Sequence, residues 1–324
     1  MPRFTERLGR LAEAAGQGGP RAVLIKREDL LPLAFGGNKL RNLEFLIGDA
    51  LAVGADCIVT SGRRWSNHCR LTAAAAARAG LEAHLVLTGP PPTRPGPNQL
   101  LDELFGSEVH FTARPDRDDR QALVGSVVAD LRAEGRRPYV IEVGGSGVTG
   151  AMGQVLAGLE LADQLASSHL DAGLVVLPSS TGGTQAGLLV GLAIAGSDAR
   201  VRGFAVSAPA PEVEASVKRL VGELVRAVGP PHPRPNTVDV DDSQLGPGYG
   251  RRSAAADEAA RLLARTEAIL VDPIYTAKAL AGLVALARTG DLADRSVVFW
   301  HAGGTIGLFE PLEDDEGRAM LAAE

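Results

Sequence analysis

Cysteine is scarce in this sequence, and several targeting features are missing. The 324 residues contain two cysteines, Cys57 and Cys69, which form no C-x-x-C arrangement. No positively charged segment followed by an apolar stretch opens the chain. No apolar run reaches the ~18 residues that a membrane span requires. These absences predict a protein of the reducing cytoplasm that does not enter a membrane.

An excess of positive charge is missing as well. The formal net charge is -6 and charged residues make up 22% of the chain, which argues against nucleic acid or an anionic membrane as the main partner. We therefore expect a small-molecule ligand. A chain of 324 residues with 45% hydrophobic content exceeds the size of most single cores, so two domains sharing a cleft are expected.

The common nucleotide-binding and hydrolase motifs are also absent. Without G-x-G-x-x-G and its later ribose-binding acid, a classical Rossmann oxidoreductase is a remote alternative. No Walker A lysine is present, and no G-x-S-x-G frames a serine. His68 stands beside Cys69, but an adjacent pair lacks usable ligand spacing, so no metal is expected there.

What the chain does contain is a regular alternation of apolar segments and helical patterns, typical of an α/β protein with mostly parallel sheets covered by helices. Ligands of such sheets bind at the carboxyl ends of the strands. The expected strands span 56–61, 82–88, 107–112, 138–143, 172–180, 201–207 and 296–304. Helical patterns follow at 70–80, 98–106 and 118–135, from about Thr184, and after Pro211.

Glycine-rich turns follow three of these strands. The turn "SSTGGTQAGL" at 179–188 leaves a strand and opens a helix, so its backbone N–H groups and the helix dipole form an anion site suited to a phosphate monoester. Taken alone, a tight turn with serine and threonine caps explains it equally well. Similar turns at 142–147 and 301–305 favour the binding site.

Lys39 in "AFGGNKLRNLEF" stands where a helix begins, a position at which the helix dipole disfavours a cation. Ser66 and Asn67 precede an alanine-rich helix and could receive a carboxylate, although an ordinary N-cap is the commoner role of such a serine. A lysine that binds an aldehyde cofactor carrying a phosphate would use all of these parts. The combination indicates pyridoxal phosphate.

The motifs resemble those of a known family. The stretches "IKREDLLPLAFGGNKLRNLEFL", "SNH", "EVGGSGVTGAMG", "TGGTQAGL", "GPGYG", "DPIYTAKALAGL" and "HAGGTIGLF" occur in the order found in the D-cysteine desulfhydrase and 1-aminocyclopropane-1-carboxylate deaminase family, within the tryptophan-synthase-β-like, fold type II pyridoxal-phosphate enzymes. The resemblance implies a two-domain fold with twisted parallel sheets and the cofactor in the interdomain cleft. It places a large cofactor domain at 1–36 and 150–324 and a small inserted domain at 37–149, and it implies a homodimer.

The same resemblance assigns roles to individual residues. Lys39 would form the Schiff base with the cofactor and later move the substrate α-proton. The other cofactor-binding residues would be Asn67 at the ring oxygen, Gly182, Gly183 and Thr184 at the phosphate, and Thr276 at the pyridine nitrogen.

The resemblance also predicts the surroundings of the substrate. Ser66 would share the acid–base work, and Tyr249 and Tyr275 would be catalytic residues flanking the substrate. Ser66, Asn67, His68 and Tyr275 would bind it. Because two of the three tyrosines fall inside family motifs, a purely structural role for them is disfavoured.

Thr276 favours β-elimination, because family deaminases carry glutamate here, and a hydroxyl cannot supply the negative charge that keeps the pyridine nitrogen protonated. Loss of a β-leaving group would then yield a 2-oxo acid and ammonia, as in D-cysteine desulfhydrase. Cyclopropane-acid deamination is the weaker alternative. A β-replacement synthase would need the same residues, and a non-catalytic binding protein is a remote possibility.

Four residues depart from the family pattern. Ala302 stands where relatives have leucine or threonine, and Arg63, Arg64 and Trp65 replace small or apolar residues and a glutamine. If an arginine faces the cleft, its N–H donors would suit a second anionic group, as in cysteate or a phosphoserine-like substrate. A solvated basic loop is the alternative.

Overall fold

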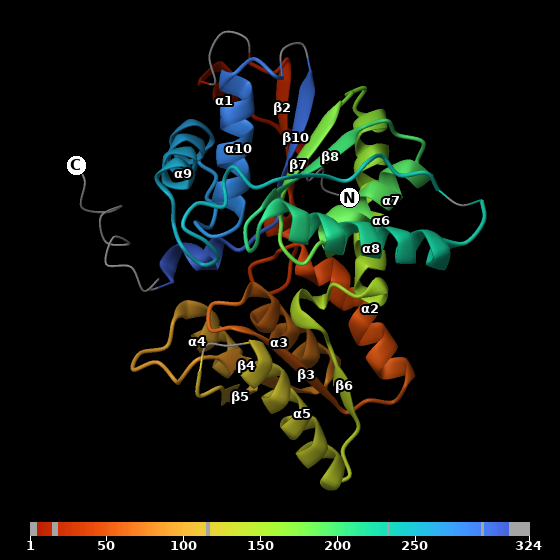
Figure 1. The fold of residues 1–324 in the computed structure, drawn as a ribbon, viewed down its shortest axis with the longest axis vertical. Coiled ribbons are helices and arrows are strands. Elements are labelled where there is room, and N and C mark those ends of the chain that lie inside the picture. Colours follow the sequence, from red (N-terminus) through yellow and green to blue (C-terminus); the bar gives the residue numbers. More distant parts are fainter. Residues whose placement is uncertain (1–4, 15–18, 115–116, 232, 293–294, 311–324) are drawn as a thin grey trace.

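The computed structural model describes residues 5–14, 19–114, 117–231, 233–292 and 295–310, which form two β-sheets flanked by helices (Figure 1). The six-stranded sheet has the order β1-β2-β10-β7-β8-β9. Its strands are β1 (Thr5–Arg7), β2 (Ala22–Arg27), β7 (Leu174–Ser179), β8 (Arg200–Ala205), β9 (Asp239–Asp241) and β10 (Ser296–His301). Only the β1–β2 pair in this sheet is antiparallel.

The second sheet has four strands, all parallel, in the order β5-β4-β3-β6. Its strands are β3 (Cys57–Arg63), β4 (Glu82–Thr88), β5 (Glu108–Phe111) and β6 (Pro138–Val140). All of them come from one continuous part of the chain. The large sheet instead pairs β2 from near the start of the chain with β10 from near its end.

Helices cover both faces of each sheet (Figure 1). They are α1 (Gly9–Ala14), α2 (Lys39–Ala52), α3 (Asn67–Ala79), α4 (Pro97–Leu104), α5 (Arg117–Ala133), α6 (Val148–Ser167), α7 (Gly183–Ile194), α8 (Ala210–Val228), α9 (Ala254–Glu267) and α10 (Thr276–Arg288), with short 3₁₀ turns at η1 (Glu28–Leu30), η2 (Val143–Gly145) and η3 (Thr305–Phe309). No helix in these described ranges is long and apolar enough to cross a membrane.

The central strands are buried on both faces, as parallel strands between helical layers must be. In β10 every residue is buried, and neighbouring side chains enter different cores. Phe299 packs in the core that includes residues of α9 and α10, whereas Val298 and Trp300 pack in the core that includes residues of α6, α7 and α8. Successive apolar side chains of β10 therefore point to opposite faces of the sheet, and each face packs against its own layer of helices.

The expected α/β class with helix-covered parallel sheets is confirmed, and each expected strand is present with shifts of a few residues at its ends. The largest differences are three residues: the strand expected at 138–143 ends at Val140, and the strand expected at 296–304 ends at His301. Gly144 and Gly145 adopt positive φ angles of 73° and 59°, which extended strand does not allow, and the chain turns into η2.

Buried ion pairs fix the helix that begins at Lys39. Arg41 Nη2 donates to Glu28 Oε1 at 2.8 Å, and its Nη1 donates to Glu160 Oε2 at 2.9 Å. Glu28 is completely buried, and the buried Lys26 also pairs with Glu160. A Cβ at Gly153 would lie 1.9 Å from Arg41 O, so α2 and α6 meet with no room for a side chain.

Candidate active site

The carboxyl ends of both sheets open into one cavity of about 880 Å³. Its walls include residues at or just beyond the ends of β3, β4, β6, β7, β8 and β10, together with the segment between η1 and α2. Such a convergence of strand ends is the usual ligand site of parallel α/β sheets. The cavity therefore provides a place where residues from distant parts of the chain can act on one ligand.

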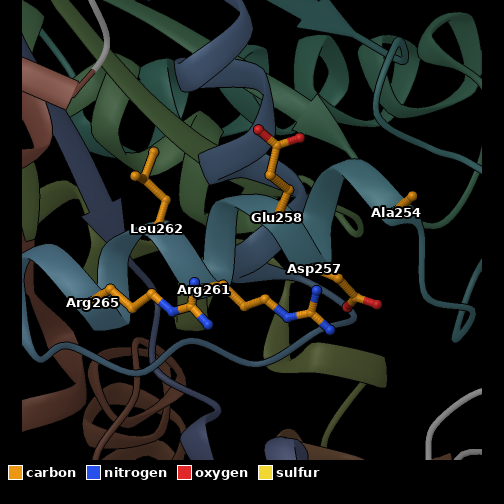
Figure 2. Close-up of a pocket in the computed structure, with 6 residues that line it drawn as sticks. All are labelled: Ala254, Asp257, Glu258, Arg261, Leu262 and Arg265. Atoms are coloured by element: carbon orange, nitrogen blue, oxygen red, sulfur yellow. The ribbon is translucent and has the colours of Figure 1, made fainter. Parts of the chain in front are cut away.

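A second depression of about 480 Å³ lies along α9 and is shown in Figure 2. All six of its labelled residues come from that helix, so no second element contributes a converging group. Its carboxylates are already paired, Asp257 with Arg252 and Glu258 with Arg288, each at 2.7 Å. We therefore look to the larger cavity for function.

Lys39 occupies the first turn of α2 and lines this cavity. Burial lowers the pKa of its ammonium to about 8. Within the described residues no carboxylate forms an ion pair with it, whereas Lys26 pairs with Glu160 and Lys278 donates to the carbonyls of Leu245 and Gly248. With this pKa roughly a tenth of Lys39 is the neutral, nucleophilic amine at pH 7, far more than for an ordinary lysine.

The expected anion site lies at the N-terminus of α7. Gly182 adopts φ +85°, and a Cβ there would lie 3.0 Å from Val217 Cγ2, so both conformation and space favour glycine. The N–H groups of the first helical turn have no intrahelical acceptor and face the cavity, which Gly182, Gly183 and Thr184 line. Asn38 Nδ2 donates to Thr184 Oγ1 at 2.7 Å and so connects this turn to the segment that carries Lys39.

Ser66 and Asn67 open α3 at the cavity wall. Ser66 is the N-cap of α3, the role that such a serine most often has, because its Oγ accepts a hydrogen bond from Cys69 N at 3.2 Å. Asn67 Oδ1 accepts from Arg70 Nη2 at 3.5 Å, which identifies Nδ2 as the side that remains able to donate. The helix start therefore offers a hydroxyl, an amide N–H and free backbone N–H groups to a ligand.

His68 also lines the cavity but is neutral. Burial, followed by the charge of Lys39, lowers its pKa to about 3. Thr60 donates its only hydrogen to Ile141 O at 2.8 Å, so His68 Nε2 must donate to Thr60 Oγ1 at 2.9 Å. This assignment leaves Nδ1 as a buried acceptor without a partner among the described residues.

The two expected tyrosines meet across the cavity. Tyr249 Oη and Tyr275 Oη lie 2.6 Å apart. Burial raises the pKa of both phenols, that of Tyr275 well above its usual value, so both stay protonated at neutral pH. Each can therefore donate one hydrogen bond, to the other or to a ligand.

Thr276 lines the cavity, and a buried acid that the sequence analysis missed stands behind it. Asp272 accepts from the backbone N–H groups of Ile274, Tyr275 and Thr276 at 2.9, 2.7 and 3.0 Å, and it also hydrogen bonds to the Thr276 hydroxyl. Burial raises its pKa, while these bonds oppose the rise. An aspartate just before a helix in "DPIYT" is a capping signal that could have revealed it.

The off-pattern residues separate into different environments. Arg63 lines the cavity with its guanidinium 5.6 Å from the ring centre of Tyr249. Arg64 lies outside the cavity lining and donates to Pro90 O at 3.3 Å, as expected if it belongs to a basic loop rather than to the substrate site.

Trp65 also lies outside the cavity lining and packs against Gly250, where a Cβ would lie 2.8 Å from the Trp65 ring. Ala302 lines the cavity, and its carbonyl accepts from Asn38 N at 2.9 Å.

Comparison with known proteins identifies the family. Residues 5–303 match the model of the pyridoxal-phosphate dependent enzyme family. The chain is 39% identical over 310 residues to "D-cysteine desulfhydrase" of Yersinia pestis (strain Pestoides F), covering 94% of this chain and 92% of that protein. It is 38% identical over 320 residues to the protein of the same name in Salmonella newport (strain SL254), covering 95% and 93%.

Solved structures agree. An "ACC deaminase homologue" superimposes with a TM-score of 0.86 at 33% identity and covers 98% of this chain and 92% of its own. A pyridoxal 5'-phosphate-dependent aspartate racemase has a TM-score of 0.68 at 17% identity, covering 93% and 89%, which shows a shared fold only.

The cavity fits pyridoxal phosphate on its own geometry. Lys39, which has no acidic partner among the described residues, lines the cavity together with a helix N-terminus whose glycine N-cap leaves room for a phosphate, and with the amide donor of Asn67. Thr276 presents a hydroxyl to the same space. The site residues and the family match agree, and this chain belongs to the pyridoxal-phosphate dependent enzymes.

Proposed function

We propose that the protein is a lyase that uses pyridoxal phosphate to eliminate a β-substituent from a small amino acid, as D-cysteine desulfhydrase does, with release of a 2-oxo acid and ammonia. The relatives named for that activity support the substrate class. The observation that carries the choice of elimination is Thr276, a completely buried residue that lines the cavity at the position where the family resemblance implies an acid in the deaminases.

We propose that the residues at the helix starts bind and orient. Backbone N–H groups of Gly183 and Thr184 would hold the phosphate, and Asn67 Nδ2 would donate to the ring oxygen. Ser66 and the free N–H groups of α3 would bind the substrate carboxylate, with neutral His68 beside them as part of the wall.

We propose that Lys39 holds the cofactor in the resting enzyme and takes the α-proton once the substrate amino group has replaced it. When bound, the cofactor supplies an electron sink for that carbon. The lowered pKa of Lys39 keeps its amine able to accept a proton near neutral pH. Tyr249 and Tyr275 remain protonated and would donate to the departing β-substituent.

A substrate panel tests this function. Purified holoenzyme would be given D-cysteine, L-cysteine, a β-chloro-alanine and 1-aminocyclopropane-1-carboxylate, and 2-oxo acid, ammonia and sulfide would be measured. We expect equal amounts of all three products from cysteine and no turnover of the cyclopropane acid. Deamination of the cyclopropane acid would instead support the deaminase alternative, and a new thioether formed with an added thiol would support β-replacement.

A second candidate function, a lyase for acidic amino acids, rests on the charges in the cavity. Its described lining contains one carboxylate, Glu142, and the cations Lys39, Arg63, Arg117, Arg120 and Arg219. Arg219 is paired with Glu223 at 2.9 Å.

Arg120 is the cation with an unused donor. Its Nη1 donates to Thr88 Oγ1 at 3.2 Å, whereas its buried Nε has no partner among the described residues. Arg63 and Arg120 could therefore bind a second anionic group on the substrate.

Arg120→Gln tests this second candidate. A charged hydrogen bond contributes about 1.5–3 kcal/mol, so we expect kcat/KM for cysteate to fall roughly 10–100-fold while that for D-cysteine changes little. Arg64→Gln, outside the cavity, is the matched control and should alter neither. An equal loss on both substrates would refute a role in selecting acidic amino acids.

We further propose that the enzyme works as a cytoplasmic homodimer, with residues 37–149 as a small domain inserted between 1–36 and 150–324. The continuous origin of the four-stranded sheet supports these boundaries. The burial of both cysteines, which are unpaired, is compatible with a reducing compartment. Sedimentation equilibrium of the holoenzyme measures the number of subunits.

A further inference from the structure

A cluster of two histidines and one glutamate lies outside the cavity, on the strands β4 and β5. The register pairs His84 directly with Glu108, so their side chains leave the sheet on the same face. His110 follows Glu108 by two residues and shares that face, because side chains alternate along a strand. The cluster thus joins an edge strand to its neighbour in the small sheet.

The three side chains converge on one point. His84 Nδ1 lies 3.4 Å from His110 Nε2 and 3.5 Å from Glu108 Oε2, and His110 Nε2 lies 3.6 Å from Glu108 Oε1. Ligands at the ~2.0–2.1 Å that zinc requires stand about 3.3–3.4 Å apart when the geometry is tetrahedral. All three separations lie close to that value.

Hydrogen bonding within the cluster is weak, because the 3.4 Å between the two imidazole nitrogens is long for a hydrogen bond. A cation with free coordination positions would satisfy all three ligand atoms at once.

The surroundings of His84 are those of a metal ligand. Its other ring nitrogen, Nε2, is buried without a hydrogen-bond partner among the described residues, and Glu82 Oε2 lies 3.9 Å from it. Arg136 Nη1 holds that carboxylate at 2.8 Å. A carboxylate that accepts a hydrogen bond from the second nitrogen is the usual support of a ligating histidine, and Glu82 would have to move closer by about 1 Å to supply it.

We propose that His84, Glu108 and His110 bind one Zn²⁺ ion through Nδ1, the carboxylate and Nε2, with water in the remaining position. Two imidazoles and a carboxylate are a ligand set that zinc commonly takes. Thr88, which lines the cavity, is four residues along β4, about 13 Å away at ~3.3 Å per residue. The ion would therefore tie β5 to β4 without touching the reacting atoms.

Zinc binding to the holoenzyme tests the proposal. After removal of metal with a chelator and gel filtration, Zn²⁺ alone would be titrated in competition with a chromogenic zinc indicator. We expect one tight site per chain, lost or weakened at least about tenfold in Glu108→Gln and in His110→Gln. Zinc should also raise the Tm of wild type but not of these variants.

Two controls make the result decisive. His169→Gln removes an exposed histidine outside the cluster and should bind zinc as wild type does. Turnover should be unchanged in all three variants, because the cluster lies outside the cavity. Absence of a stoichiometric site in wild type, or equal affinity in Glu108→Gln and His110→Gln, would overturn the proposal. Since Glu108 is largely exposed, its substitution should leave the metal-free fold intact.

Discussion

Lys39→Ala is expected to abolish the visible absorption of the bound cofactor and to lower kcat by at least about a thousandfold, because one amine serves both as the covalent anchor and as the base. No other lysine can replace it. Of the four lysines, Lys26 and Lys278 are engaged in ion pairing or hydrogen bonds, and Lys218 is exposed beside Glu214. Spectra and turnover of the reconstituted variant provide the measurement.

Borohydride reduction of the wild type locates the anchor directly. We expect mass spectrometry to find the reduced cofactor on the peptide that contains Lys39. Lys218→Ala is the matched control and should keep the spectrum and activity of wild type. Attachment at Lys26 or Lys278, or retained absorption and turnover in Lys39→Ala, would contradict the assignment of the whole site.

Arg41→Ala is expected to lower the free energy of unfolding by about 3–5 kcal/mol, since it leaves the completely buried carboxylate of Glu28 without its partner. Chemical denaturation measures the loss. Glu28→Gln in the same chain should restore part of the stability by removing the uncompensated charge. Arg288→Ala breaks an exposed pair with Glu258 and should cost less than about 1 kcal/mol. Equal losses in Arg41→Ala and Arg288→Ala would refute a special contribution of the buried pair.

The same network gives a pH dependence of defined sign. Burial raises the pKa of Glu160, but hydrogen bonds from Arg41 and Lys26 outweigh this effect and lower it from 4.5 to about 2. A folded pKa below the unfolded one means that the stabilisation is complete above pH 4.5 and is lost as pH falls toward 2. Between these values the stability of Arg41→Ala should therefore fall less steeply with acid than that of wild type.

The sequence was sufficient for the fold class because the strands are buried on both faces and read as short apolar runs. Their ends were harder to locate, since the boundary depends on backbone angles that single glycines adopt. The strands expected at 138–143 and 296–304 end three residues early, at Val140 and His301, and left-handed glycines follow them at Gly144 and Gly303. Lys39, Ser66 and the glycine turn before α7 could be predicted because each stands at a helix start, where particular residue types mark the boundary in the sequence itself.

Residues that reach the cavity from helix sides had no such local signal. Arg120 lies on α5 among other charged residues, and only the packing of that helix on the small sheet brings it beside Arg63. Arg64 shows that sequence neighbours can also differ. It follows Arg63 directly at the end of β3, but Arg63 lines the cavity and Arg64 does not. The zinc cluster likewise depends on the register of β4 with β5, which no single stretch of sequence contains.

The strand order of the two sheets also has a consequence for how the chain matures on the ribosome. The four-stranded sheet is complete once residue 140 has emerged, so it can form early from local contacts. β2 must instead wait for β10, which ends at residue 301, before it gains its parallel neighbour. Until β10 emerges, one edge of the apolar "AVLI" stretch of β2 has no neighbouring strand, and such an edge is exposed to aggregation during synthesis.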